Sequence, residues 1–389
     1  MVRSRYLALA AGMAVVLIAG GPIALQARQW IGAAFPQSFG TIVRAGITIV
    51  IGAAMLVALA RIGRPGRGQR ADRTLDQRRL RYGALVSALA AGIVFARALR
   101  TGNSAIDVVE AFHFVEYGLL ACLFYVAWLP LGDGSVVILP LLFGLLVGTL
   151  DEWVQWLVPF RVGEIRDVVL NFVAVGCGLL FGIALQPPAH LTVRLCHHSI
   201  RRICAMLAVV TLVLAAFFQS VHLGHDVRDE EIGTFRSRYT REELAAAGAV
   251  RLERWRRDPP LAPGRFSRED QYLSEALWHV RRRNEAERAG DISTSWRENR
   301  IVEIFFAPVL DTPNYVSRSG FRWSPIQRAN AAAQVRPDAA IDRRPAEPYP
   351  LYPWPRTTFW GVIALLVAAA GVVCLSSERS RHGRQADSR

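Results

Sequence analysis

The stretch SVVILPLLFGLLVGTLDEWVQW, residues 135–156, decides the fold. It has no charged residue before Asp151, and its length is close to the roughly 20 residues that a helix needs to cross a hydrocarbon core about 30 Å thick. The segments of a water-soluble core are shorter and more periodic. This stretch therefore predicts a membrane-spanning helix with acidic groups at one end.

Further apolar runs of similar length occur along the chain. Together the predicted spans cover residues 6–26, 40–60, 83–100, 111–130, 135–156, 167–186, 204–222 and 357–376. We therefore expect an all-α polytopic membrane bundle of about eight helices. The first run follows Arg3 and Arg5 and also fits a signal peptide, but its length and the lack of a clear cleavage site favour an uncleaved anchor.

The positive charge gives the orientation. The net charge is +14, and the arginines gather in the N-terminus, the 61–82 and 187–203 loops and the 377–389 tail. Because cytoplasmic loops are rich in Arg and Lys, this pattern predicts a bacterial cytoplasmic (inner) membrane protein with both termini in the cytoplasm and residues 223–356 outside it. The arginines lie in short connections beside apolar runs, as expected for a protein embedded in a membrane. We therefore predict the lipid bilayer as partner and no binding of nucleic acid.

The predicted spans divide the chain into six parts. We expect N-terminal transmembrane helices over 1–104, a transmembrane core over 105–186, a basic cytoplasmic loop with the seventh helix over 187–222, a soluble domain over 223–356, the last helix over 357–376 and a basic tail over 377–389. The five cysteines lie in apolar runs or basic connections without a metal-like pair, so we expect no disulfides, and we predict no metal and no cofactor.

The soluble domain is expected to be small and mainly helical. Thr240 and Glu243 have the spacing of a capping box, which predicts a short helix over 240–248. A longer helical pattern runs from Ser267 to about Arg288, with Gly290 just beyond its end. The β-branched and aromatic run 301–306 predicts a strand, and residues 325–348 are expected to be poorly ordered.

Polar residues in three consecutive predicted helices share one depth at the outer side. Because such groups are expensive inside a membrane unless paired or wet, they are candidates for a functional site. The candidate ligand-binding residues are Glu110, His113, Glu116, Tyr117, Asp151, Glu152, Gln155, Arg161, Asp167 and Asn171. A structural interpretation remains open beside the functional one: a polar network that pins the three helices together, flanked by Trp and Tyr anchors.

Two sequence blocks at these positions resemble the VanZ-like family of bacterial membrane proteins. The block HFVEYGLL, residues 113–120, is similar to the family's H-F-x-x-Y-x-x-L core. The second block follows the family's order of acidic-x-x-Q, P-x-R, D-x-x-x-N and small-residue elements, and it comprises Gly148, Asp151, Glu152, Gln155, Pro159, Arg161, Asp167, Asn171, Gly176 and Gly178. The resemblance covers about residues 105–186.

The resemblance departs from the family pattern before the histidine. An acidic residue followed by Lys is frequent there, whereas this chain has Val109 and Glu110, which leaves Arg161 or Arg166 as substitutes for the missing cation. The family takes its name from a protein associated with low-level glycopeptide resistance. The resemblance implies a multi-pass protein of the cell envelope, for which antibiotic resistance is an association and not an assigned role.

Three functions follow as hypotheses. In the first, the polar residues bind or modulate an envelope precursor, a lipid headgroup or a glycopeptide antibiotic, with cell-wall or polysaccharide precursors as partners. In the second, the protein is a membrane enzyme acting on a lipid-linked phosphate or glycan, with His113, Glu152 and Asp167 as candidate catalytic residues and Arg161 as an anion clamp. In the third, it is a non-catalytic assembly scaffold. The sequence favours a protein that is not an enzyme, because it has no nucleophile elbow and no P-loop.

Overall fold

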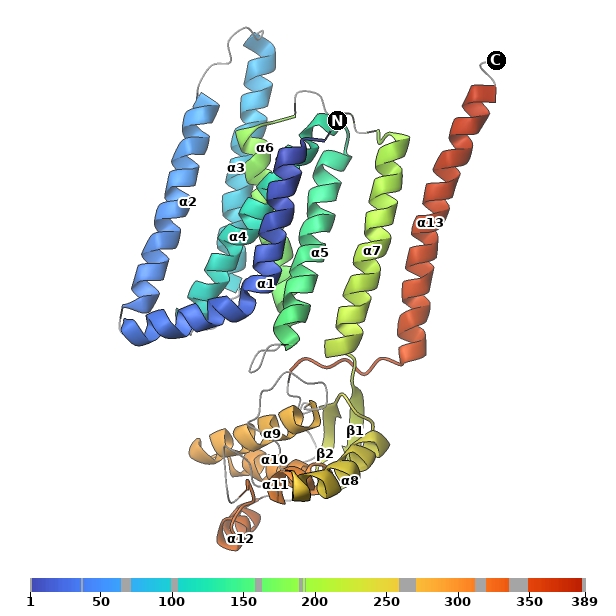
Figure 1. Cartoon of the computed structure of the whole chain (residues 1–389). Helices are drawn as coiled ribbons and strands as arrows, with labels where there is room; N and C mark the ends of the chain where they lie inside the picture. Colours follow the sequence, from blue (N-terminus) through green and yellow to red (C-terminus); the bar gives the residue numbers. More distant parts are fainter. Residues whose placement is uncertain are drawn as a thin grey trace. The chain divides into compact units, whose positions relative to one another are not determined.

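The computed structural model describes residues 2–35, 38–63, 71–98, 104–157, 163–188, 192, 194–258, 271–311, 320–335 and 349–386 (Figure 1). The chain forms two compact units. The first comprises Met1–Gln155, Ile165–Phe217 and Gly361–Arg389, and the second comprises Trp156–Glu164 and Phe218–Trp360. Each unit is described by itself below.

Long helices make up the first unit. They are α1 (Ser4–Ala34), α2 (Phe39–Gly63), α3 (Ala71–Ala98), α4 (Ser104–Trp128), α5 (Ser135–Leu157), α6 (Ile165–Leu185), α7 (His197–Val221) and α13 (Arg356–Ala386), with the short 3-10 turn η1 (Leu129–Leu131) after α4. Among the described residues, six helices are long and apolar enough to cross a membrane: α2, α4, α5, α6, α7 and α13. This confirms a multi-pass, mainly helical membrane protein, while the count of eight crossings stays a prediction.

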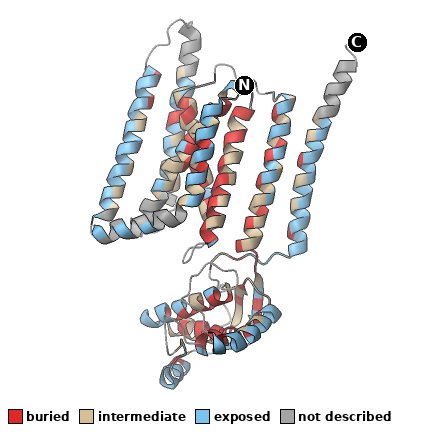
Figure 2. Cartoon of the chain, viewed as in Figure 1, coloured by how far each residue is buried: buried red, intermediate tan, exposed pale blue. Residues whose placement is uncertain are grey.

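The core of the first unit is formed by α1, α4, α5, α6 and α7. It contains, in that order, the buried side chains of Ala10, Tyr117, Leu139, Val175 and Val210. Figure 2 shows that buried residues line α5 and α6, whereas α2 and α13 are mostly exposed. Because the exposed faces are apolar, they are suited to contact lipid rather than water.

Glycines allow α4, α5 and α6 to approach closely. A methyl group added at Gly178 on α6 would lie 2.2 Å from the carbonyl oxygen of Gly118 on α4. One added at Gly144 on α5 would lie 2.5 Å from a methyl group of Val175 on α6. Lipid tails are as apolar as leucine, so membrane helices associate through such close packing of small residues. These contacts fix the three helices that carry most of the candidate site.

A buried polar junction ties the start of α5 to the start of α7. The Asp133 carboxylate accepts hydrogen bonds from the backbone N–H groups of Ser135 and Cys196, each at 3.0 Å. The Ser135 hydroxyl also donates to Asp133, and the Ser199 hydroxyl lies 3.2 Å from that of Ser135. Burial alone would raise the pKa of Asp133, but the hydrogen bonds from Ser135, Cys196 and Ser199 lower it to about 2. The carboxylate therefore stays ionised and holds both helix starts.

The second unit combines a two-stranded antiparallel sheet with helices. The strands are β1 (His225–Asp229) and β2 (Gly233–Ser237), paired with Val227 opposite Phe235. The helices are α8 (Arg241–Arg257), α9 (Gln271–Arg288), α10 (Ile292–Phe305), α11 (Ala307–Asp311) and α12 (Pro325–Gln334). The sequence did not reveal this hairpin, because its strands are short and mostly polar. Its turn ends at Gly233, whose φ of 79° is a conformation that glycine adopts without strain.

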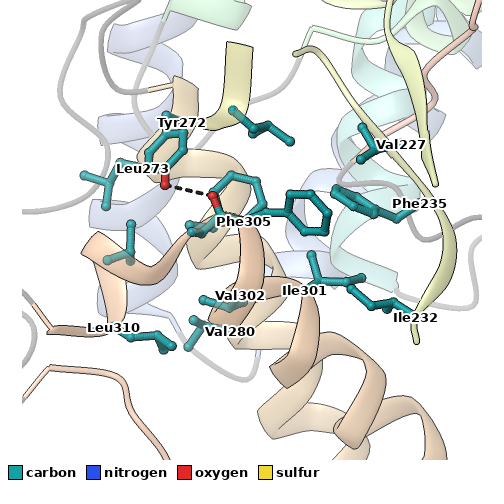
Figure 3. Packing of buried hydrophobic residues seen from close by; sticks show 14 of the residues in the cluster. Val227, Ile232, Phe235, Tyr272, Leu273, Val280, Ile301, Val302, Phe305 and Leu310 are labelled. Carbon is teal, nitrogen blue, oxygen red and sulfur yellow. Dashed lines mark hydrogen bonds between the residues drawn. The ribbon is translucent and has the colours of Figure 1, made fainter. Parts of the chain in front are cut away.

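The core of the second unit is apolar and rich in aromatic residues (Figure 3). Phe305 and Phe235 pack with ring centroids 4.9 Å apart, and Ile301 and Val302 lie beside them in the same cluster. The hydroxyl of buried Tyr272 donates to the Phe305 carbonyl at 2.9 Å, as the dashed line in Figure 3 marks. A satisfied hydroxyl allows a tyrosine to lie at the centre of an apolar core.

The prediction of a strand over 301–306 is wrong, because residues 301–305 lie in α10. The helix begins after Asp291, whose side chain accepts the backbone N–H of Thr294 at 3.0 Å. Ile301, Val302 and Phe305 are buried at helical spacing, while Glu303 pairs with Arg328 at the surface. Tertiary burial of one helical face thus overrides the β propensity of the run.

The other predictions for this region have mixed outcomes. The capping box at Thr240 and Glu243 forms as expected, although α8 extends to Arg257 rather than to residue 248. The predicted helix from 267 to 288 is α9, and its expected start lies outside the described residues. Within 325–348, α12 forms behind a capping box of Ser324 and Gln327, so poor order is wrong for residues 325–334. Residues 336–348 lie outside the described part of the chain.

Candidate functional site

The centre of the candidate site is a hydrogen bond between two fully buried side chains. The Tyr117 hydroxyl on α4 donates to Asp151 Oδ2 on α5 at 2.8 Å. Tyr117 is 0% exposed and Asp151 is 2% exposed. A buried carboxylate is expensive unless hydrogen-bonded, so this bond joins α4 and α5 at a defined point.

Asn171 brings the third helix to the same point. Gly148 on α5 lies so close that an added methyl group would be 3.1 Å from Asn171 Cβ and 3.7 Å from Tyr117 Cε1. Asn171 is 1% exposed, and its amide nitrogen Nδ2 has no hydrogen-bond partner among the described residues. Buried amide groups in native proteins are normally satisfied, so this donor is a feature that requires an explanation.

The site extends to the surface along α4. His113 Nδ1 lies 3.5 Å from Glu116 Oε2, and both side chains are about a quarter exposed, at 24% and 25%. The His113 ring centroid is 6.3 Å from that of Tyr117. The exposed His113–Glu116 pair and the buried Tyr117–Asp151 pair therefore adjoin each other on one helix.

Two further predicted residues lie on the same helix end as Asp151. Glu152 and Gln155 are only 2% and 3% exposed, and Glu152, like Glu116, is close enough to interact electrostatically with Tyr117. The sequence placed these polar residues near the membrane surface. The structure buries the α5 members in protein, where a polar side chain must find partners, and their depth in a membrane stays a prediction.

The remaining predicted residues are Asp167, Glu110 and Arg161. Asp167 is half-buried in the first turn of α6, where the helix dipole favours a carboxylate. Arg166 beside it is half-buried as well. Glu110 belongs to α4, but its side chain is not described, and Arg161 lies outside the described residues. Of the site residues expected from the sequence, the structure therefore describes the side chains of all but Glu110 and Arg161.

The chemistry of the assembled group is that of a polar binding site. It offers carboxylates that accept hydrogen bonds, an unsatisfied amide donor and one imidazole that can gain a proton. Within the described ranges, no group of three or more His, Cys, Asp or Glu residues is arranged to hold a metal ion. The sequence names Gly148 as a member of the second family block, but it does not reveal how closely Gly148 approaches Asn171 and Tyr117.

Comparison with known proteins bears on this region of the chain. Searches of curated proteins and of solved structures found no match. Residues 48–186 match the VanZ/LLP1 family model, which confirms the resemblance predicted over 105–186 and extends it toward the N-terminus. The segment that matches this family model contains every residue of the candidate site.

Proposed function

We propose that this multi-pass membrane protein binds a polar headgroup of a bacterial envelope molecule at the polar site, defined as His113, Glu116, Tyr117, Asp151, Glu152, Gln155 and Asn171. The ligand class comprises membrane-bound cell-wall or polysaccharide precursors, lipid headgroups and amphiphilic glycopeptides. These molecules share oxygen acceptors and hydroxyl or amide donors next to an apolar portion. The site faces the extracytoplasmic side in the orientation that the arginine distribution predicts.

One observation carries the proposal: the buried amide donor of Asn171, which has no hydrogen-bond partner among the described residues. A purely structural network would satisfy such a donor, because an unmade buried hydrogen bond costs about 1–3 kcal/mol. An oxygen acceptor from a bound headgroup would satisfy it. The same headgroup could offer hydroxyl or amide donors to nearby carboxylates, which accept them.

The partial exposure of His113 and Glu116 supports access to the site. Their side chains are about a quarter exposed, whereas Tyr117 beside them is fully buried. A ligand can therefore reach the site from the surface of α4 without separating the α4–α5 contact. Membrane ligands of this kind are held by a few fixed polar groups within largely apolar walls.

A specific contact supports an enzyme as the alternative function. His113 and Glu116 are 3.5 Å apart, which is close enough for a carboxylate to orient an imidazole that acts as a general base. Glu116 takes the orienting place for which the sequence suggested Glu152 or Asp167. In this alternative the bound precursor would be consumed, whereas in the binding function it would be recovered unchanged.

The proposal is tested on the full chain in lipid nanodiscs with two probes, a polyprenyl-linked sugar precursor and a glycopeptide antibiotic. Asn171→Leu removes the amide and should weaken binding of at least one probe by roughly tenfold, the effect of about 1.4 kcal/mol, without lowering membrane abundance. The matched control is Thr149→Val on α5, because the Thr149 hydroxyl donates within its own helix, to the Leu145 carbonyl at 2.8 Å.

The outcomes separate the three hypotheses. Loss of binding in Asn171→Leu but not in Thr149→Val supports the site, and turnover of the sugar precursor that His113→Ala abolishes supports the enzyme. If both variants bind as the wild type does, the site is structural. If the point variants leave an envelope phenotype such as glycopeptide susceptibility unchanged, and deletion of residues 230–350 alters it, the scaffold hypothesis is correct.

A further inference from the structure

A second polar cluster lies in the second unit and shares no residue with the polar site. Its centre is Arg238, which directly follows β2. The guanidinium carbon of Arg238 lies 5.2 Å from the centre of the Trp156 ring, and its Nη1 donates to Gln271 Oε1 at 3.2 Å. Cation–π contact and a hydrogen bond thus fix the guanidinium against residues from α5 and α9.

Two donors of this cluster are buried without a well-formed hydrogen bond. Arg238 Nε and the Tyr349 hydroxyl are inaccessible to solvent, and the two side chains are close enough to interact with each other, but neither atom makes a hydrogen bond of good geometry to a described residue. Burial raises the pKa of Tyr349, although the charge of Arg238 nearby opposes this, so the hydroxyl stays protonated. Both groups can therefore donate, and a single acceptor between them would satisfy both.

One buried acid, Glu275, contacts Arg238 through the backbone of that residue. Glu275 is 1% exposed and accepts the backbone N–H of Arg238 at 3.1 Å and the Ser237 hydroxyl at 2.6 Å. Burial raises the pKa of Glu275 and so favours its neutral form. Burial likewise lowers the pKa of His222, which therefore adds no competing cation.

Two residues of this region adjoin the ends of candidate membrane spans in the sequence. Trp156 is one residue from the end of the candidate span Ser135–Leu157, and His222 directly follows the candidate span His197–Val221. His222 Nδ1 donates to the Pro350 carbonyl at 2.8 Å, and this hydrogen bond holds the residue after Tyr349 next to the end of α7. Tryptophan and tyrosine are enriched at membrane–water interfaces, where the phosphate groups of lipids also lie.

We propose that Arg238, Tyr349 and Trp156 form a binding site for a phosphate group. Arginine presents N–H groups in a planar fork that matches phosphate oxygens. Arg238 Nε and the Tyr349 hydroxyl donate to the phosphate oxygens, and the Trp156 ring holds the guanidinium in place. The phosphate belongs to a lipid headgroup or is free phosphate, and both offer the same anionic oxygens.

The test uses the purified full chain in detergent with three probes. They are short-chain phosphatidylglycerol, the matching diacylglycerol that lacks phosphate, and inorganic phosphate. Phosphatidylglycerol should bind the wild type, while diacylglycerol should not. Arg238→Gln should weaken phosphatidylglycerol binding by about tenfold or more, as expected for loss of hydrogen bonds to a charged group. Competition by inorganic phosphate at similar concentration assigns the site to free phosphate, and its failure to compete assigns the site to a headgroup.

Two further variants make the test decisive. Arg256→Gln, on an exposed position of α8, changes the net charge equally and should leave affinity unchanged. Tyr349→Phe keeps the ring and the charge but removes one donor, so it should weaken binding by roughly threefold, and it decides the question if Arg238→Gln folds poorly. Equal affinities of Arg238→Gln and Arg256→Gln, or an unchanged affinity of Tyr349→Phe, would overturn the proposal. Asn171→Leu should not alter this binding, so the result is independent of the proposed function.

Discussion

Buried polar side chains are arranged differently in the two units. In the first unit, described buried polar side chains gather at the α4–α6 site and at the Asp133 junction, and glycine contacts pack the helices between them. In the second unit, a buried ionic network crosses an aromatic core: His279 Nδ1 lies 2.5 Å from Glu298 Oε2, and Arg282 Nε lies 2.9 Å from Glu298 Oε1.

The difference follows from the solvent. A bilayer offers no hydrophobic gain when helices associate, so close packing of small residues stabilises the first unit and polar groups persist at a few points. The sequence predicts that the second unit lies in water, where the burial of apolar area would stabilise it and outweigh the desolvation of its charged groups. Different kinds of substitution should therefore destabilise the two units.

The largest effect is expected from an aromatic truncation in the second unit. Phe235 is fully buried against His279 and Phe305, and Phe235→Ala should lower the free energy of unfolding by about 3–5 kcal/mol. The measurement is hydrogen exchange in α9 and α10 of the full chain. Ile326→Ala, at a position that is 73% exposed, is the control and should change exchange little.

Protection in the first unit should be unaffected by Phe235→Ala if the units fail separately. Equal loss of protection in both units would instead show one cooperative structure and would break the comparison. A loss of less than about 1 kcal/mol would mean that the aromatic core is not what stabilises the second unit.

The second largest effect is expected from adding a single methyl group in the first unit. Gly178→Ala places Cβ 2.2 Å from the Gly118 carbonyl oxygen, so α4 and α6 must separate, at a cost of roughly 1–3 kcal/mol. Gly176→Ala on the same helix is a matched control, since a methyl group there meets no atom within 4 Å. Thermal unfolding in detergent should show a lower midpoint for Gly178→Ala alone. Equal midpoints would mean that glycine packing does not hold the bundle.

A pH effect is expected in the second unit from Glu275. Its pKa is raised by burial, so the folded state retains a proton that the unfolded state releases. The contribution of this proton to stability is complete below the unfolded pKa near 4.5 and is lost as the pH rises through the folded value. The free energy of unfolding should therefore fall by at most about 1.4 kcal/mol per pH unit across that window.

Glu275→Gln tests this directly, because a glutamine keeps the shape of the neutral acid and does not titrate. The variant should show a flatter dependence of unfolding free energy on pH and should be the more stable protein at the alkaline end. Parallel pH profiles of the two proteins would show that Glu275 is ionised in the folded state.

Much of the first unit could be predicted from the sequence, because the bilayer imposes a simple rule. Long apolar runs must be helices, and His113, Glu116 and Tyr117 all fall within the single predicted span 111–130. The contact of Asn171 with Gly148 could not be predicted, since it depends on how α5 and α6 are rotated. The Asp133 junction was missed for the same reason: its partners Cys196 and Ser199 are distant in sequence.

The second unit was harder to predict, because in water local preference and tertiary burial compete. The local capping signal of Thr240 and Glu243 was correct, since it depends only on neighbouring residues. The run beginning at Ile301 has a high strand propensity. It nevertheless forms a helix, because its apolar residues are buried at helical spacing in the same cluster as Phe235. Arg283, which follows two exposed arginines in the sequence, is buried and donates to Asn299.

The smallest effect is expected at the cap of α8, where the local rule applies by itself. The Thr240 side chain accepts the backbone N–H of Glu243 at 3.2 Å, and the Glu243 carboxylate accepts that of Thr240 at 2.9 Å. Thr240→Ala removes the first bond and should cost about 1 kcal/mol, while Thr240→Ser keeps the hydroxyl and should cost much less. Faster hydrogen exchange confined to the first turn of α8 is the expected signature. If exchange instead rises throughout α9 and α10, the cap stabilises the whole aromatic core. Local capping would then be as important for the stability of the second unit as glycine packing is for that of the first.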